Sequence, residues 1–308
     1  MIAIWLVSIV ITLTCLTVIG MVLHARSSPM EILASYRGEL KEVEVRRRES
    51  STTAVIDDVT LRDDRGTYVS FLLHQPVDST RRYPAVVILG GVEVGKETLR
   101  YIDEGGVIIA ALAYPYDIGK ASGWWSALKE IGAMREAAFR TVAGASLVAD
   151  FLHQKNIDTS SVILVGYSFG APFVPAVMRM DQRYKVAAIL YGGGRLGELI
   201  GNNLDTGFTP LNRVLGSMAG SLLAPIEPLR HVKAIAPRQL IMIQGEHDEL
   251  MPPRLAQELF DFAHEPKEII WLETEHIMPW KKEIINQVII TLRKWLEQAG
   301  YLSPKPID

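Results

Sequence analysis

The stretch SVILVGYSFGAP, residues 161–172, constrains the fold of this chain more than any other segment. Four apolar residues, 162–165, lead into Gly166, and a single serine, Ser168, lies between that glycine and Gly170. A buried strand can turn sharply into a helix here, because glycines two positions either side of the serine avoid a collision of side chains. The serine hydroxyl would then protrude above the sheet. The stretch therefore predicts a nucleophile, and a tight turn without chemistry is the alternative.

Apolar runs of strand length alternate with helical stretches through most of the chain. The runs that suit strands covered on both faces are 84–91, 106–115, 161–167, 185–193, 238–245 and 267–274. Residues 54–61 and 67–76 flank a turn signal and predict an antiparallel pair, and residues 125–154 and 281–299 have helical periodicity. The series predicts an α/β fold built on a mostly parallel, doubly wound sheet of about eight strands.

Two segments depart from this alternation. Residues 25–52 are polar and predict a connector. Residues 195–236 are rich in leucine, glycine and proline and predict a cap inserted into a domain that spans residues 53–302. The cap is apolar enough to cover a lipophilic substrate, and the alternatives are contact with a membrane or burial in the core.

The first 23 residues carry no charged side chain. Because a helix of about 20 apolar residues spans a bilayer core, residues 1–24 predict an N-terminal transmembrane helix that is retained as an anchor. A cleaved signal peptide is the main alternative. It is disfavoured because no basic residue precedes the apolar run and because the run exceeds the usual length of roughly 7–15 residues. The best cleavage site follows Ala25, and it would place Leu23 at position −3, where signal peptides have a small residue. A buried core helix is the third possibility.

Positive charge follows the predicted anchor and none precedes it. Arg26, Arg37 and Lys41 are the basic residues closest to it. Because lysine and arginine accumulate on the cytoplasmic side of a span, the expected localisation is a membrane protein with its catalytic domain in the cytoplasm. A secreted or periplasmic enzyme is the alternative if the segment is cleaved.

Composition excludes several other functions. The net charge is −3 and the basic residues are dispersed, so nucleic acid is not an expected partner. Cys15 is the only cysteine and no Cys/His cluster has zinc spacing, so no metal is expected. The glycine-rich loop 90–97 lacks the spacing of a phosphate-binding loop and of the dinucleotide fingerprint, and no cofactor is expected.

A serine nucleophile needs a base. Where the serine lies in a turn between a strand and a helix, an acid and then a histidine should follow it in the sequence. His276 is the only one of the seven histidines that lies between the last predicted strand and the last predicted helix. Asp248 follows the preceding strand at the spacing Gly245-x-x-Asp, and it is the expected acid, with Glu246 and Glu249 as alternatives. For His276 the alternative is an ordinary surface histidine.

An oxyanion formed at the serine needs two N–H donors. One is expected from Phe169, which follows the serine and begins the next helix. The other is expected from the loop after the 84–91 run, with Val92 as first choice and Gly91 as second. Trp124 and Trp125 follow a strand end and either line an acyl pocket or pack against the following helix.

Over roughly residues 55–300 the chain resembles the α/β-hydrolase fold, because the turn at 166–170, the glycine-rich loop, Asp248 and His276 occur in the order of that fold. Within it, residues 86–115 and 227–253 resemble the dienelactone hydrolase and acyl-CoA thioesterase branches, and the second stretch also resembles peptidase-like esterases. Two features depart from these relatives: dienelactone hydrolases use cysteine as nucleophile, and Gly-Gly replaces the usual His-Gly in the loop.

The resemblance implies acyl transfer to water. It predicts a serine hydrolase that cleaves a small-molecule carboxylic ester or thioester through an acyl-serine intermediate, without metal or cofactor. A serine peptidase of the same fold and a non-catalytic hydrolase-like binding module are the alternatives.

Overall fold

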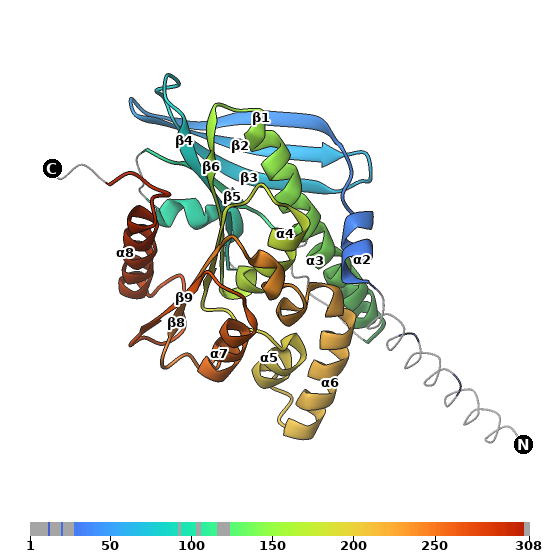
Figure 1. Cartoon of the computed structure of the whole chain (residues 1–308). Coiled ribbons are helices and arrows are strands. Elements are labelled where there is room, and N and C mark those ends of the chain that lie inside the picture. The colour runs from blue at the N-terminus through green and yellow to red at the C-terminus, as the bar shows by residue number, and fades with distance from the viewer. Residues whose placement is uncertain are drawn as a thin grey trace, which may run out of the picture.

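Nine strands form one sheet in the computed structural model, which describes residues 28–91, 94–102, 106–115 and 124–304 together with Thr12 and Gly20. The strands are β1 (Leu40–Ser50), β2 (Ala54–Asp63), β3 (Tyr68–Pro76), β4 (Tyr83–Leu89), β5 (Ile108–Leu112), β6 (Ile157–Tyr167), β7 (Val186–Leu190), β8 (Gln239–Gly245) and β9 (Lys267–Leu272). Their order in the sheet is β1-β2-β3-β5-β4-β6-β7-β8-β9 (Figure 1). Pairing is antiparallel from β1 to β5 across β2 and β3, and parallel from β5 to β9. The mostly parallel α/β sheet predicted from the sequence is confirmed.

Strand β1 lies inside the segment predicted as a connector, so the sheet has nine strands and not eight. Its sequence, LKEVEVRRRES, lacks a buried apolar face, and Val43 and Val45 are 46% and 49% exposed. An edge strand that is wet on both faces carries no apolar alternation to reveal it. Backbone pairing with β2, in which Val45 lies opposite Val59, holds β1 in place. Helix α2 (Pro29–Ser35) precedes it and buries Leu33 in the core.

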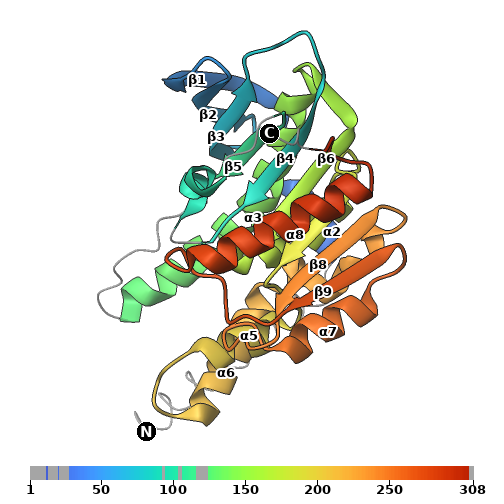
Figure 2. The ribbon, with the colours of Figure 1, turned by 90° about the vertical axis from the view of Figure 1, so that its left-hand side faces the viewer.

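Helices cover both faces of the sheet, as expected of a doubly wound fold. One face is covered by α2, α3 (Trp124–His153) and α4 (Val174–Met180), and the opposite face by α8 (Lys282–Gln298) and a 3-10 helix, Gly95–Tyr101 (Figure 1). Figure 2 shows α8 running across its face of the sheet. Alternate strand residues therefore enter two separate cores, with Val87 of β4 on the α3 side and Ile88 on the α8 side.

The predicted cap, residues 195–236, lies between β7 and β8 and is helical. It contains α5 (Leu196–Asn203) and α6 (Thr209–Leu222), followed by three short 3-10 helices that bury Ile226, Val232 and Ile235 in the core on the α3 side. Glycines let α5 and α6 approach closely, because a Cβ on Gly216 would lie 2.3 Å from the carbonyl oxygen of Gly197. Helix α7 (Pro253–Phe262) then connects β8 to β9.

The predicted anchor, residues 1–24, falls outside the described residues except for Thr12 and Gly20. Within the part of the chain that the structure describes, no helix combines the length and the apolar character needed to cross a bilayer.

Candidate active site

The turn after β6 gives Ser168 a left-handed backbone with φ of 51°. Neither flanking glycine has room for a side chain. A Cβ on Gly166 would lie 2.4 Å from Cγ2 of Val174, and a Cβ on Gly170 would lie 2.0 Å from the carbonyl oxygen of Leu89. Both approaches are far inside van der Waals contact, so the close packing of β6, β4 and the following helix requires glycine at both positions. This turn presents the Ser168 hydroxyl at the carboxyl end of the parallel strands.

The structure brings Ser168, His276 and Asp248 together in one hydrogen-bonded series. Ser168 Oγ lies 2.8 Å from His276 Nε2, and His276 Nδ1 lies 2.7 Å from Asp248 Oδ2. His276 and Asp248 are both buried. With Nδ1 donating to the carboxylate, Nε2 carries the lone pair and can accept the serine proton.

Backbone donors fix the carboxylate of Asp248. Its Oδ1 accepts hydrogen bonds from the N–H groups of Leu250 at 2.9 Å and Met251 at 2.8 Å, which leaves Oδ2 directed at the histidine. The two alternative acids, Glu246 and Glu249, are exposed. Burial and hydrogen bonding therefore place Asp248, and neither glutamate, against His276.

Tyr191 positions the loop that carries the histidine, and sequence reasoning missed it. It follows β7, is fully buried, and has φ of 52°. Its hydroxyl bonds to Oγ1 of Thr274 at 2.5 Å, and its ring meets the His276 imidazole edge-on with centroids 5.7 Å apart. Burial raises the pKa of Tyr191, so its hydroxyl stays protonated. A positive φ is unusual for a bulky residue, and no sequence pattern predicted it at Tyr191.

Two of the predicted oxyanion donors, Phe169 and Gly91, line the same cavity as Ser168. Phe169 is the second residue of the 3-10 helix Ser168–Phe173, so its N–H has no acceptor within that helix. Gly91 lies against the ring of Tyr167 and lines the same cavity as Ser168. Val92, the first choice for the second donor, falls outside the described residues.

Three hydroxyl groups hold the glycine-rich loop against the turn. Tyr114 donates to the carbonyl oxygen of Gly90, Thr98 bonds to Tyr167 at 2.8 Å, and Thr98 also donates to the carbonyl oxygen of Gly95 at 2.6 Å. Burial raises the pKa of Tyr114 well above its usual range, and the neighbouring Tyr167 adds to this, so Tyr114 remains a donor. These positioning residues were not predicted, because their partners are distant in the sequence.

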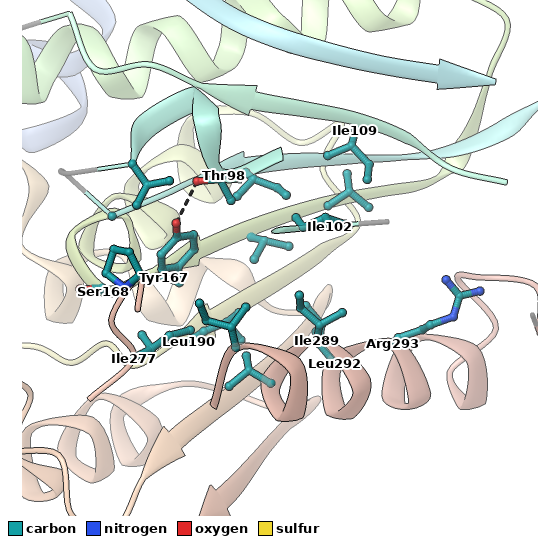
Figure 3. Close-up of a pocket in the computed structure, with 18 of the residues that line it drawn as sticks. Thr98, Ile102, Ile109, Tyr167, Ser168, Leu190, Ile277, Ile289, Leu292 and Arg293 are labelled. Carbon is teal, nitrogen blue, oxygen red and sulfur yellow. Dashed lines mark hydrogen bonds between the residues drawn. The ribbon is translucent and has the colours of Figure 1, made fainter. Parts of the chain in front are cut away.

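A cavity of about 320 Å³ opens beside Ser168 and continues between the sheet and α8; it is called the α8 cavity below. In Figure 3 Ser168 lies at one end and Arg293 at the other, with Ile289 and Leu292 directed upward from α8. Its apolar lining includes Ile88, Ile109, Val165, Leu190, Ile277, Ile285, Val288, Ile289 and Leu292. Such a space is a candidate ligand site.

The predicted cap and tryptophans contribute nothing that can be placed at this cavity. Among the described residues, none from 195–236 lines it. Trp124 and Trp125 begin α3, but their side chains lie outside the described part of the structure. Within the described residues, no group of three or more histidine, cysteine, aspartate and glutamate side chains is arranged to hold a metal ion.

Known proteins resemble this chain in two ways. The family model described as serine hydrolase (FSH1) matches residues 101–288, more than half of the chain. Solved structures share its fold, and they include an acetyl xylan esterase from Paenibacillus sp. R4, with a TM-score of 0.62 at 16% identity over 85% of this chain and 92% of that chain. Acetyl xylan esterase 1 from Thermoanaerobacterium sp. JW/SL YS485 has a TM-score of 0.61 at 16% identity over 86% and 92%.

A third solved structure, the 2,6-dihydroxy-pseudo-oxynicotine hydrolase, has a TM-score of 0.57 at 16% identity over 82% of this chain and 70% of that chain. No curated protein matches the chain. At these identities the solved structures bear on the fold alone, and they confirm the predicted α/β-hydrolase fold. The finer resemblance to the dienelactone hydrolase and acyl-CoA thioesterase branches stays a prediction.

Proposed function

The chain belongs to the serine hydrolase (FSH1) family, and from this premise we propose that it cleaves carboxylic esters or thioesters through an acyl-serine intermediate on Ser168. The observation that carries the proposal is the continuous contact from Ser168 Oγ to His276 Nε2 and from His276 Nδ1 to Asp248. A serine hydroxyl attacks a carbonyl only when a base removes its proton, and this arrangement supplies one.

In the acylation step, Ser168 Oγ attacks the carbonyl carbon while its proton moves to His276 Nε2. The carbonyl oxygen becomes an oxyanion that accepts hydrogen bonds from the N–H of Phe169 and from that of Val92, or of Gly91 in its place. The proton on His276 then passes to the leaving oxygen or sulfur, and the bond between that atom and the carbonyl carbon breaks. Asp248 holds the imidazole tautomer and stabilises the imidazolium that forms between the two transfers.

In the deacylation step, water replaces the departed leaving group beside His276. His276 removes a proton from this water, the hydroxide attacks the acyl carbon, and the same proton returns to Ser168 Oγ as the acid product leaves. The hydrogen bonds of Tyr114 to Gly90 and of Thr98 to Tyr167 support this cycle, because an oxyanion donor must be in place before charge develops.

The test is hydrolysis of p-nitrophenyl acetate by the wild type and by Ser168→Ala. We expect the substitution to lower kcat by on the order of 10⁴–10⁶-fold, as removal of a triad serine does elsewhere. Thermal melting controls for folding, and it should change little because alanine and serine tolerate the left-handed backbone equally poorly. Turnover retained by a folded Ser168→Ala protein would exclude Ser168 as nucleophile.

We also propose that residues 1–24 anchor the chain in a bilayer and that α6 lies against the membrane surface. The uncharged N-terminal sequence supports an anchor. Helix α2, which begins at Pro29 and so follows that segment closely in the sequence, packs against the 3-10 helix Ala224–Ile226, and this 3-10 helix follows α6. On α6 itself Leu211, Val214 and Met218 are exposed at helical spacing, an apolar stripe that suits a lipid interface.

A cytoplasmic catalytic domain is proposed from the charge that follows the anchor. Arg37 pairs with Asp150 and Lys41 with Glu39 inside the folded domain, so the proposal depends chiefly on Arg26.

A further inference from the structure

The α8 cavity has walls that match a hydrocarbon chain. Aliphatic side chains of β4, β5 and β6 form one wall, represented by Ile88, Ile109 and Val165, and aliphatic side chains of α8 form the other. The hydroxyls of Thr98 and Tyr167 at its edge bond to each other, so they do not require a polar ligand (Figure 3). A polar or charged ligand would lose its hydration here without gaining partners along these walls.

The cavity extends along α8. Its α8 wall runs from Ile285 to Leu296, a distance of roughly 16 Å at about 1.5 Å per residue. The Arg293 side chain lies at the end away from Ser168, where its Nε donates to Glu297 at 2.8 Å. A linear acyl chain has the length to follow this path.

The cavity volume sets the length of that chain. An apolar cavity of about 150 Å³ accommodates benzene, which has six carbon atoms. On the same scale the α8 cavity, at about 320 Å³, has room for roughly thirteen carbons, so an acyl chain of about ten to twelve carbons fits within it.

The order of the catalytic steps favours the acyl group over the alcohol as occupant. During catalysis the leaving group must take a proton from His276 and depart before water enters, whereas the acyl group remains bonded to Ser168 through both steps. A cavity that begins at Ser168 suits the group that stays.

We propose that the α8 cavity binds the linear acyl chain of an ester of a medium-length fatty acid, with the carbonyl at Ser168 and the chain directed under α8 toward Arg293. This inference rests on the proposed function of Ser168. It adds the substrate class, and it assigns Ile289 and Leu292 as residues that set the preferred chain length.

The test is the kcat/KM of the full chain for p-nitrophenyl esters from acetate to palmitate. Burial of each added methylene should raise kcat/KM by about fourfold until the cavity is full, with an optimum near ten to twelve carbons and a fall beyond it. Ile289→Trp fills the middle of the cavity and should lower the decanoate to acetate ratio by at least 50-fold. Ile290→Trp is the matched control, because Ile290 lies on the same helix but is 65% exposed, and it should keep the wild-type ratio.

A second variant works in the opposite direction. Leu292→Ala enlarges the cavity and should move the optimum toward longer chains by two to three carbons. A flat chain-length profile, or equal effects of Ile289→Trp and Ile290→Trp, would overturn the acyl-chain proposal. The proposed function would still hold in that case if acetate turnover depended on Ser168. Acetate hydrolysis that Ser168→Ala leaves unchanged would overturn both the acyl-chain proposal and the proposed function.

Paired alkyl esters test the orientation of the substrate. Ethyl dodecanoate places the long chain on the acyl side and dodecyl acetate places it on the alcohol side. We expect a preference for ethyl dodecanoate that Ile289→Trp abolishes. A preference for dodecyl acetate that is sensitive to the same substitution would assign the cavity to the alcohol and contradict the acyl assignment.

Discussion

At the scale of single residues, the buried carboxylate of Asp248 controls the orientation of His276. Asp248→Asn keeps the shape but presents a donor amide to Nδ1 or forces the other tautomer, so Nε2 would no longer accept the serine proton. We expect kcat to fall by on the order of 10⁴-fold, as in the triad template. Steady-state hydrolysis of p-nitrophenyl acetate measures the loss.

The exposed neighbours of Asp248 are its matched controls. Glu246→Gln and Glu249→Gln should change kcat less than twofold, because both glutamates are exposed and the carboxylate that bonds to His276 is that of Asp248. A larger loss for either glutamate than for Asp248 would assign the acid to that residue instead.

The candidate triad could be predicted from the sequence because its members follow strands whose order along the chain is readable. The apolar runs before Ser168 and Asp248 are continuous and buried, the run before His276 is apolar but mostly half-buried, and each residue follows the end of its run. Tyr191 and Tyr114 could not be predicted, because their roles depend on contacts with Thr274 and Gly90, which only the folded chain brings near.

At the scale of elements, the apolar strands and helices were predictable and β1 was not. Burial on both faces gives β4 to β8 a strong sequence signal. Strand β1 has none, because its side chains are mostly exposed and it is held to β2 by backbone pairing and by ion pairs such as that of Arg47 with Asp57. The α8 cavity could not be predicted either. It depends on how α8 and the 3-10 helix Gly95–Tyr101 pack against the sheet, and this packing leaves part of that sheet face uncovered.

The segment between α6 and β8 contains a buried histidine that should make stability depend on pH. The pKa of His231 is lowered to about 4, chiefly by burial. The hydrogen bond from Nε2 to the carbonyl oxygen of Pro225 raises the pKa, and the charges of Arg179 and Arg230 lower it. The unfolded chain takes up this proton as pH falls below about 6.5, while the folded chain does not until about 4. The contribution of His231 to the free energy of unfolding is therefore complete above pH 6.5 and is lost as pH falls from 6.5 to 4.

His231→Gln keeps a donor for Pro225 and removes the titrating group. We expect the wild type to lose about 2 kcal/mol more than the variant between pH 7 and pH 5. Urea unfolding at the two pH values gives this difference. Parallel losses in both proteins would show that His231 does not contribute to the pH dependence.

At the scale of the whole molecule, the folded domain begins at α2, since Leu33 is buried in the core. A chain that begins at Ser28 retains α2 and every described strand, so we expect it to be soluble and to hydrolyse p-nitrophenyl acetate at the full-length rate. The full-length chain should sediment with membranes and resist carbonate extraction, because an uncharged helix satisfies its own backbone hydrogen bonds in lipid.

N-terminal sequencing of the membrane fraction is the control for cleavage. A mature N-terminus near Arg26 would show a cleaved signal and would contradict the anchor. An insoluble or inactive chain beginning at Ser28 would show that the preceding residues belong to the folded domain.

The central claim is that Ser168 is the nucleophile, and a fluorophosphonate probe tests it most directly. The probe forms a covalent bond only with a serine whose hydroxyl is activated by a neighbouring base, and peptide mass spectrometry locates the adduct. The account predicts one adduct, on Ser168, that disappears in Ser168→Ala and is strongly reduced in His276→Ala. An adduct on another residue, or undiminished labelling of a folded Ser168→Ala protein, would contradict it.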